Sequence, residues 1–246
     1  MKYTGERLVP GDENLKPQLT EDLSRFVFAG HHLTGKYVLD AGCGAGQGAH
    51  YMAANVAREV VAVDIDFDSV DFAKKHYQRD NLEFITMSVE QLSFSADTFE
   101  AVTSIEVIEH LYHHDRYLAG IARILKPGGV YIMSTPNKRR SSPTPGALWP
   151  AHTREFYLHE LRELLVIYFS EVEMWGESVP VYERHPLRRM VRYLAPIFKP
   201  ILPHGLRTTI LPSLHRMIKS DLTLNDIVFS KDNIEEAPTL MAVCLK

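Results

Sequence analysis

The sequence predicts an α/β fold organised around a mainly parallel sheet. Short apolar runs alternate with helical patterns through most of the 246 residues. A glycine-rich loop follows the first run, and the second run ends in Asp64 about 20 residues later, as in nucleoside-binding folds. With 45% apolar and 24% charged residues, the chain has the composition of a globular domain with a sizeable core.

The expected strands are short runs rich in apolar, β-branched and aromatic residues. Glycine, proline or acidic residues stand at or next to the ends of most of these runs, which limits each run to strand length. In chain order the strands cover Tyr37–Asp40, Glu59–Asp64, Leu82–Met87, Phe99–Ile105, Gly129–Thr135, Glu171–Trp175 and Leu240–Leu245.

The expected helices are the stretches between these runs with apolar residues at helical spacing. Four of them cover Gly48–Ala57, Asp68–Arg79, Asp115–Leu125 and Glu155–Tyr168. A fifth precedes the first strand over Leu19–Ala29, where Thr20 can cap the helix and Leu23, Phe26 and Val27 form its inner face.

Two stretches interrupt the alternation of strands and helices. Residues 136–150 are rich in proline, serine and basic residues, which indicates a loop. Residues 178–232 carry several prolines, which indicates an insertion of short helices before the last strand. We therefore expect an N-terminal helical segment at 1–35, a core formed by 36–177 and 233–246, and a helical insertion at 178–232.

Charge is concentrated in the insertion, although the net charge of the chain is only −4. Residues 184–219 contain eight Lys or Arg and no Asp or Glu, and part of this segment reads as a basic amphipathic helix. Such a segment fits a lid, a contact with an acidic or lipid-linked substrate, or peripheral contact with a membrane. The acidic isoelectric point and the lack of an aromatic-and-basic module argue against a nucleic-acid partner.

The two cysteines and the polar N-terminus predict a cytoplasmic protein. Cys43 and Cys244 are far apart and lack the spacing of a metal site, which fits a reducing compartment. The first residues have no apolar segment typical of a signal peptide. The basic insertion extends this expectation to peripheral contact at the inner membrane face.

The glycine loop reads VLDAGCGAGQG over residues 38–48. Glycines allow a sharp turn and close approach of a ligand, and Asp64 is placed to accept hydrogen bonds from ribose hydroxyls. Two cofactor classes fit this pattern. The spacing Gly44-x-Gly46-x-x-Ala49 matches a loose dinucleotide fingerprint. Asp40, however, would repel a pyrophosphate and favours a cationic or amine-bearing cofactor.

Four motifs together resemble the class I S-adenosylmethionine-dependent methyltransferases. They are DAGCGAG at 40–46, VDID at 63–66, LKPGG at 125–129 and STPN at 134–137, and the resemblance covers about residues 36–175 and the last strand. It implies a Rossmann-like, seven-stranded, mainly parallel sheet with an antiparallel last strand and helices on both faces.

The resemblance also implies which residues bind S-adenosyl-L-methionine. It assigns the loop to the methionine part of the cofactor, Asp40 to its amino group and Asp64 to its ribose. Ser88 stands where many of these enzymes carry an acidic residue that meets adenine, so Ser88, the Val89 backbone and Glu90 all remain candidates for that contact. The full set of expected cofactor contacts is Asp40, Gly42, Cys43, Gly44, Gly46, Asp64, Ile65, Ser88, Val89, Glu90 and Ile105.

Shorter motifs resemble two subfamilies. EVIEHL followed by LKPGG and STPN is similar to the ubiquinone-pathway O-methyltransferases. The opening YTGERLVP with the LSRFVFA helix is similar to bacterial methyltransferases associated with cell-surface polysaccharide clusters.

The stretch SIEVIEHL places Glu106, Glu109 and His110 at the end of the fourth strand, beside the expected reactive methyl group. Their spacing puts all three on one face if the chain is helical there. His110 could act as a general base that the carboxylates orient. With His152 downstream, the three could instead bind Mg²⁺, Mn²⁺ or Zn²⁺, as a similar stretch does in small-RNA 2′-O-methyltransferases. They could also be only the polar side of a helix.

The sequence therefore predicts an S-adenosylmethionine-dependent methyltransferase that methylates a hydroxyl group of a small molecule. The expected acceptors are a sugar, a lipid-linked glycan or a quinone-type phenol. The alternatives are a nicotinamide-dependent oxidoreductase, a non-catalytic S-adenosylmethionine-binding protein and, more remotely, an RNA 2′-O-methyltransferase.

Overall fold

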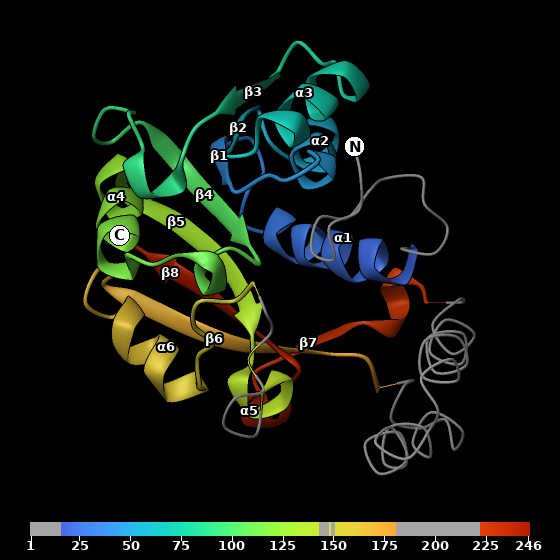
Figure 1. Ribbon diagram of the computed structural model, residues 1–246, viewed down its shortest axis with the longest axis vertical. Coiled ribbons are helices and arrows are strands. Elements are labelled where there is room, and N and C mark those ends of the chain that lie inside the picture. The colour runs from blue at the N-terminus through green and yellow to red at the C-terminus, as the bar shows by residue number, and fades with distance from the viewer. Residues whose placement is uncertain (1–15, 143–147, 149–150, 181–221) are drawn as a thin grey trace.

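A twisted sheet of eight strands organises the chain (Figure 1). The computed structural model describes residues 16–142, 148, 151–180 and 222–246. The strands are β1 (Tyr37–Ala41), β2 (Glu59–Asp64), β3 (Leu82–Thr86), β4 (Phe99–Ile105), β5 (Leu125–Pro136), β6 (Glu171–Ser178), β7 (Val228–Ser230) and β8 (Thr239–Leu245). They lie in the order β3-β2-β1-β4-β5-β8-β6-β7.

The helices of the described residues connect the strands. They are α1 (Lys16–Gly30), α2 (Gln47–Asn55), α3 (Phe67–His76), α4 (His114–Ile124), α5 (Lys138–Ser141) and α6 (Leu158–Leu165). Short 3₁₀ helices are η2 (Val89–Gln91), η3 (Ile108–His110), η4 (Leu224–Asp226) and η5 (Ile234–Glu236). None of these helices is long and apolar enough to cross a bilayer.

The direction of the strands confirms the predicted fold class. β1 to β5 pair in parallel, and β8 runs antiparallel between β5 and β6. The sheet has one strand more than the seven expected, because β7 adds three residues to the edge at β6. This strand was not predicted because three residues are too few to show the alternation typical of a strand. It also lies inside the expected insertion.

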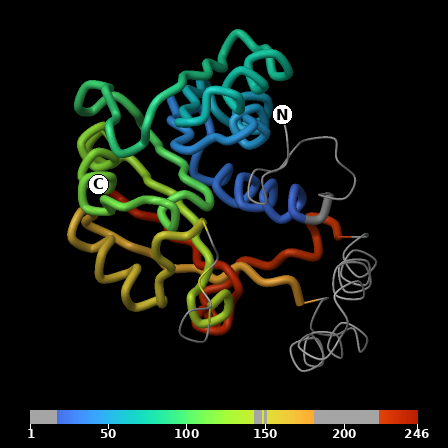
Figure 2. The backbone as a smooth tube through the Cα atoms, viewed as in Figure 1, coloured from blue at the N-terminus to red at the C-terminus, as the bar shows by residue number. Residues whose placement is uncertain are grey.

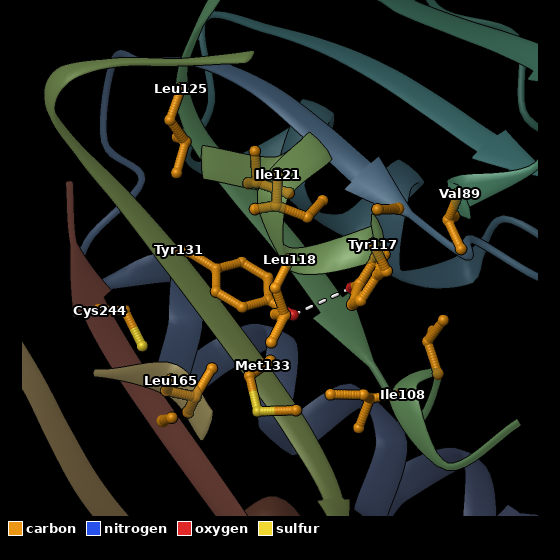
Figure 3. Packing of buried hydrophobic residues seen from close by; sticks show 14 of the residues in the cluster. Val89, Ile108, Tyr117, Leu118, Ile121, Leu125, Tyr131, Met133, Leu165 and Cys244 are labelled. Atoms are coloured by element: carbon orange, nitrogen blue, oxygen red, sulfur yellow. Dashed lines mark hydrogen bonds between the residues drawn. The ribbon is translucent and has the colours of Figure 1, made fainter. Parts of the chain in front are cut away.

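Helices cover both faces of the sheet, as predicted. Successive residues of β1 and β2 point to opposite faces, so each strand contributes to two separate cores. One core packs under α4 and α6, and Figure 3 shows part of it around Tyr117 and Tyr131. The other core packs under α1, α2 and α3.

Helix α1 lies at the carboxyl end of the sheet, where open α/β folds bind their ligands. It contacts α2 and β4, and in Figure 1 the arrowhead of β4 points toward it. It also contacts η4, near the other end of the sequence, and Figure 2 shows this red segment beside the blue helix. The helix predicted before the first strand therefore lies over the carboxyl ends of the strands.

Several element boundaries differ from the expected ones: α1 begins at Lys16, so Thr20 lies inside it rather than capping it. Two of the differences have clear local reasons. β5 begins at Leu125 rather than Gly129, because Leu125 pairs with Phe99 before a shift in register brings Val130 opposite Ala101. Helix α6 begins at Leu158 rather than Glu155, because Phe156 bridges to Asn137 and Glu155 binds side chains of the preceding loop.

Two predictions fall largely outside the described residues. The basic segment at 184–219 lies wholly outside them, so its predicted contact with a lid, lipid or acidic substrate stays a prediction. The loop predicted at 136–150 is described only up to residue 142 and at 148; within it, Pro136 ends β5 and Lys138–Ser141 form α5.

Candidate functional site

The glycine loop joins β1 to α2 and turns through three left-handed glycines. Gly42, Gly44 and Gly46 have φ of 89°, 51° and 87°, a region that other residues rarely adopt. The loop is anchored to β2, because the amides of Gly42 and Cys43 donate to the Val63 carbonyl over 2.8 and 2.9 Å. A tight turn of left-handed backbone therefore stands at the carboxyl end of β1, where the sequence predicted the cofactor.

Asp40 lies under this loop and keeps one carboxylate oxygen without a protein partner. Its side chain is buried, and Oδ1 accepts a hydrogen bond from the Thr103 hydroxyl over 2.9 Å. Among the residues that the structure describes, none pairs with Oδ2. Burial raises the pKa of Asp40 to about 7, which the Thr103 hydrogen bond only partly opposes. A buried carboxylate of this kind fits a ligand that brings an amino group or positive charge.

Asp64 ties the end of β2 to the glycine loop. Its Oδ2 accepts from the Gly44 amide over 2.8 Å, and its Oδ1 accepts from the Asp66 amide over 2.9 Å. Each carboxylate oxygen can accept a further bond, which leaves room for ribose hydroxyls. The adjacent Ile65 is 69% exposed, so an apolar side chain lies open beside this carboxylate.

The three candidates for the adenine contact differ in what they already do. Ser88 caps η2 by accepting from the Glu90 amide over 3.3 Å, and Val89 is buried. Glu90 accepts from the amides of Tyr112 and His113 over 3.2 and 2.9 Å. The Glu90 carboxylate therefore holds the residues after η3 through Oε1, and its contact with adenine stays a prediction.

Glu106 does not share a helical face with Glu109 and His110, which corrects the expectation from their spacing. It follows the last residue of β4 with φ of 54°, a left-handed conformation that is unusual for a residue other than glycine. The helical turn that follows is only η3, so the i, i+3 relation does not apply. The Glu106 carboxylate instead accepts from the Ser134 hydroxyl over 2.7 Å and lies 3.8 Å from the Arg25 guanidinium of α1.

Three of the four predicted metal ligands do lie together. One ligand atom each from Glu109, His110 and His152 lies within 4.8 Å of the others. We call these three residues the Glu-His-His cluster. Glu109 is buried, whereas His110 and His152 are partly exposed, so the cluster opens toward one side. Glu106 lies outside it, because its backbone turns the carboxylate toward α1.

Each histidine of the cluster is oriented through Nδ1. His152 Nδ1 lies 2.6 Å from the Glu155 carboxylate, and His110 Nδ1 lies 3.2 Å from the Ala151 carbonyl. Since both partners are acceptors, each Nδ1 carries the proton and Nε2 becomes the lone-pair nitrogen. Proteins commonly orient metal-binding or proton-accepting histidines in this way.

The Glu155 carboxylate is itself held in the ionised state. It is buried, which opposes ionisation, but hydrogen bonds from Ser141, Ser142 and His152 outweigh burial and lower its pKa. Sequence analysis did not single out Glu155 or the two serines. The spacing His-x-x-Glu in HTRE was the available signal, although it says nothing about which face the two side chains share.

Glu109 is fixed at both its side chain and its backbone. Its Oε2 accepts from the Thr135 hydroxyl over 2.9 Å, and its carbonyl accepts from the Thr153 amide over 2.7 Å. Burial, reinforced by the nearby Glu106 charge, raises the pKa of Glu109 well above its ordinary value. A buried carboxylate with a raised pKa is stabilised by a nearby cation or by taking up a proton. Either can reach Glu109 from the open side of the cluster.

The apolar core beneath η3 sets the direction of the cluster. Ile108 is buried in the core shown in Figure 3, near Tyr117 of α4. Tyr117 donates to Ser104 Oγ over 2.6 Å and lies 2.9 Å from the Tyr131 hydroxyl. This hydrogen-bonded core fixes the chain just before Glu109, so the next two side chains project above the strand ends.

Comparisons with known proteins agree with this geometry. A methyltransferase-domain family model matches residues 39–133, which contain the glycine loop and η3. A probable S-adenosylmethionine-dependent methyltransferase of Mycolicibacterium smegmatis is 37% identical over 178 residues, covering 70% of this chain and 66% of that protein. A ubiquinone biosynthesis O-methyltransferase of Coxiella burnetii is 30% identical over 151 residues, covering 59% of this chain and 63% of that protein.

The chain thus spans slightly less than two thirds of the length of either relative. Among solved structures, an S-adenosylmethionine-dependent methyltransferase from Thermotoga maritima superposes with a TM-score of 0.65 at 15% identity. That superposition covers 94% of this chain and 92% of the other, and it supports the fold.

Proposed function

Because the chain belongs to the class I S-adenosylmethionine-dependent methyltransferases, we propose that it transfers a methyl group to a hydroxyl group of a small molecule. The observation that carries the proposal is the position of the Glu-His-His cluster. Glu109 and His110 come shortly after β4, the neighbour of β1 in the sheet, and Val107 just before them packs against Gly42 of the glycine loop. The O-methyltransferase among the relatives supports oxygen as the acceptor atom.

Residues of the glycine loop and β2 fit the methyl donor. The unpaired Oδ2 of Asp40 suits the amino group of S-adenosylmethionine, and Asp64 suits its ribose hydroxyls. When bound, this cofactor supplies the electrophilic methyl group on a sulfonium. The protein must therefore align a hydroxyl oxygen with that methyl group and remove the hydroxyl proton.

The Glu-His-His cluster can assist removal of that proton in two ways. Glu109, His110 and His152 have the donor types that hold Mg²⁺, Mn²⁺ or Zn²⁺, and a bound cation would lower the pKa of the acceptor hydroxyl. Without a cation, Nε2 of His110 would accept the proton directly, since the Ala151 carbonyl holds Nδ1–H. Both routes need the His110 tautomer in which Nδ1 donates to the Ala151 carbonyl.

For the acceptor we propose a sugar, a lipid-linked glycan or a quinone-type phenol. The short resemblances to ubiquinone-pathway and polysaccharide-associated methyltransferases support these classes. The basic segment at 184–219 adds support for an acidic or lipid-linked acceptor. An RNA acceptor is disfavoured by the isoelectric point near 6.3.

The first test separates the methyltransferase from the oxidoreductase. Calorimetric titration with S-adenosylhomocysteine should show one site per chain, and titration with NADH should show none. Replacing Asp40 with Asn should weaken binding of S-adenosylhomocysteine, because the amino group loses its charged partner. Saturable binding of NADH instead would contradict the proposal.

The second test measures transfer of a labelled methyl group to a panel of sugars, glycan lipids and catechols. We expect His110→Ala to lower the rate by about 10²-fold or more, while binding of S-adenosylhomocysteine is retained. His76→Ala on the exposed side of α3 is the matched control. If no acceptor is methylated while binding persists, the chain is a cofactor-binding protein without this activity.

A chelator distinguishes the two catalytic routes. Loss of methyl transfer with EDTA, restored by Mg²⁺, Mn²⁺ or Zn²⁺, is the outcome expected of a metal-assisted enzyme. Activity that is indifferent to the chelator would assign proton removal to His110 alone.

A further inference from the structure

A buried arginine of α1 gathers three carboxylates from different parts of the fold. Arg25 is 8% exposed, and its Nε lies 2.6 Å from the Glu177 carboxylate of β6. One of its terminal nitrogens, Nη1, lies 3.2 Å from Asp22 on the same helix and 3.8 Å from Glu106 after β4. We call these four residues the Arg25 network.

The network carries more negative than positive charge. One guanidinium faces three carboxylates, and Asp22 and Glu106 lie within about 7 Å of each other because both approach the same Arg25 nitrogen. Desolvation raises the pKa of Glu177 to about 7, so this carboxylate is partly protonated at neutral pH. Even then, the Asp22 and Glu106 charges together exceed the single charge of Arg25.

The excess charge lies on the side of the expected cofactor. Asp22 and Glu106 are 37% and 27% exposed at their side chains, whereas Arg25 and Glu177 are nearly covered. Glu106 follows β4 next to the glycine loop, where Val107 packs against Gly42. Asp22 is close enough to Asp40 for its charge to contribute to the raised pKa of Asp40, after burial, the main cause. Glu21, on the same helix, adds to the repulsion at Asp22.

A salt bridge that only held α1 on the sheet would need just one carboxylate opposite Arg25. The extra carboxylates cost stability in the empty protein, because like charges at short distance repel in a partly dehydrated site. The left-handed backbone at Glu106 is a further local strain. A cationic ligand bound at this edge of the sheet would offset these unfavourable energies.

We propose that the Arg25 network, through Asp22 and Glu106, makes the site favour the cationic methyl donor over its uncharged product. This inference rests on the proposed function. During transfer the carbon–sulfur bond breaks, a carbon–oxygen bond forms and the hydroxyl proton leaves. The sulfur therefore loses its positive charge, and the attraction of the network for the cofactor weakens after each turnover.

The proposal assigns Asp22 a positioning and specificity role that sequence analysis did not. In this role its charge would attract the positive sulfonium of the bound cofactor, in addition to holding Arg25. Asp22→Asn removes the charge at almost constant shape, and Asp22→Glu keeps it. Asp71→Asn on α3 is a matched control, since that carboxylate forms an ion pair with the exposed Lys75 on the same helix.

The test compares two cofactor analogues by calorimetry at about pH 8, above the pKa of about 6 that burial gives Asp22. Sinefungin carries an ammonium in place of the sulfonium methyl, whereas S-adenosylhomocysteine is uncharged at the sulfur. We expect Asp22→Asn to weaken sinefungin binding about fivefold relative to S-adenosylhomocysteine, the effect of one charge acting through a partly hydrated environment. Asp22→Glu and Asp71→Asn should leave the ratio within about twofold of the wild type.

The outcomes of this test are distinguishable. Equal weakening of both analogues by Asp22→Asn would overturn the proposal. The Arg25 network would then serve only to hold α1 on the sheet. An unchanged ratio would overturn it as well. A wild-type protein that binds neither analogue would contradict the proposed function itself, and the inference with it.

Discussion

Replacing Gly48 with alanine tests how tightly α1 is packed on the helix after the glycine loop. A Cβ at Gly48 would lie 2.1, 2.2 and 2.4 Å from three ring carbons of Phe26 in α1. Carbon atoms in contact are ordinarily about 3.5–4.0 Å apart, so the ring would have to retreat by more than about 1 Å. Phe26 is only 6% exposed, which leaves it little room to move.

Two effects of opposite sign decide the result. Alanine inside a helix is favoured over glycine by about 1 kcal/mol. Overpacking a buried position disfavours the folded state by about 1–3 kcal/mol, and three ring atoms at once place Gly48 at the upper end of this range. We therefore expect Gly48→Ala to lower the free energy of unfolding by about 2 kcal/mol.

Gly120 in α4 provides the control. It has a helical position as well, but a Cβ there would meet nothing within 4 Å. Gly120→Ala should therefore raise the free energy of unfolding by up to about 1 kcal/mol. Urea unfolding followed by circular dichroism measures both variants. Combining Gly48→Ala with Phe26→Leu should recover part of the loss, because the smaller side chain can move aside.

The packing argument would be refuted if Gly48→Ala stabilised the protein as Gly120→Ala does. It would also be refuted if Phe26→Leu made the Gly48→Ala protein less stable by as much as it destabilises the wild type. Either result would mean that α1 is not held against α2 by the Phe26 ring.

Further predictions concern the two carboxylates that orient the site. Glu155→Gln should weaken binding of Zn²⁺ or Mn²⁺ by about 10–100-fold, measured against a chromophoric chelator, because His152 loses its charged partner; the exposed Glu163→Gln should not. Asp40 has its pKa raised from 3.8 to about 7, so its ionisation disfavours the folded state and stability falls as pH rises through this window. Asp40→Asn should remove that part of the fall, and an unchanged slope in urea unfolding between about pH 5 and pH 8 would contradict it.

Much of the sheet could be predicted because its strands are buried on both faces. Buried parallel strands read as continuous apolar runs, such as those before Asp64 and around Val102, and glycine or acidic residues mark many of their ends. The start of α6 could not be read in this way. It depends on Glu155 being drawn to His152 and two serines, a contact that helical periodicity does not encode.

The cofactor half of the site was predictable because its signal is local. Left-handed turns at Gly42, Gly44 and Gly46 need glycine, and the hydrogen bond from Gly44 to Asp64 follows from adjacent parallel strands. The direction of Glu106 was not predictable. It depends on the left-handed backbone of a residue other than glycine. It also depends on Arg25, which lies on a helix far away in the sequence.

Hydrogen bonds hold the chain in place on both sides of residues 143–150. On one side, Asn137 receives the Arg139 amide and donates to the carbonyls of Glu235 and Ala237. On the other side, Thr153 donates to Glu109 through both its amide and its hydroxyl. The position of His152 therefore does not depend on what lies between these two fixed points. If the chain transfers a methyl group as proposed, that interval could change in length or sequence to suit a new acceptor while His152 and Glu109 keep these contacts.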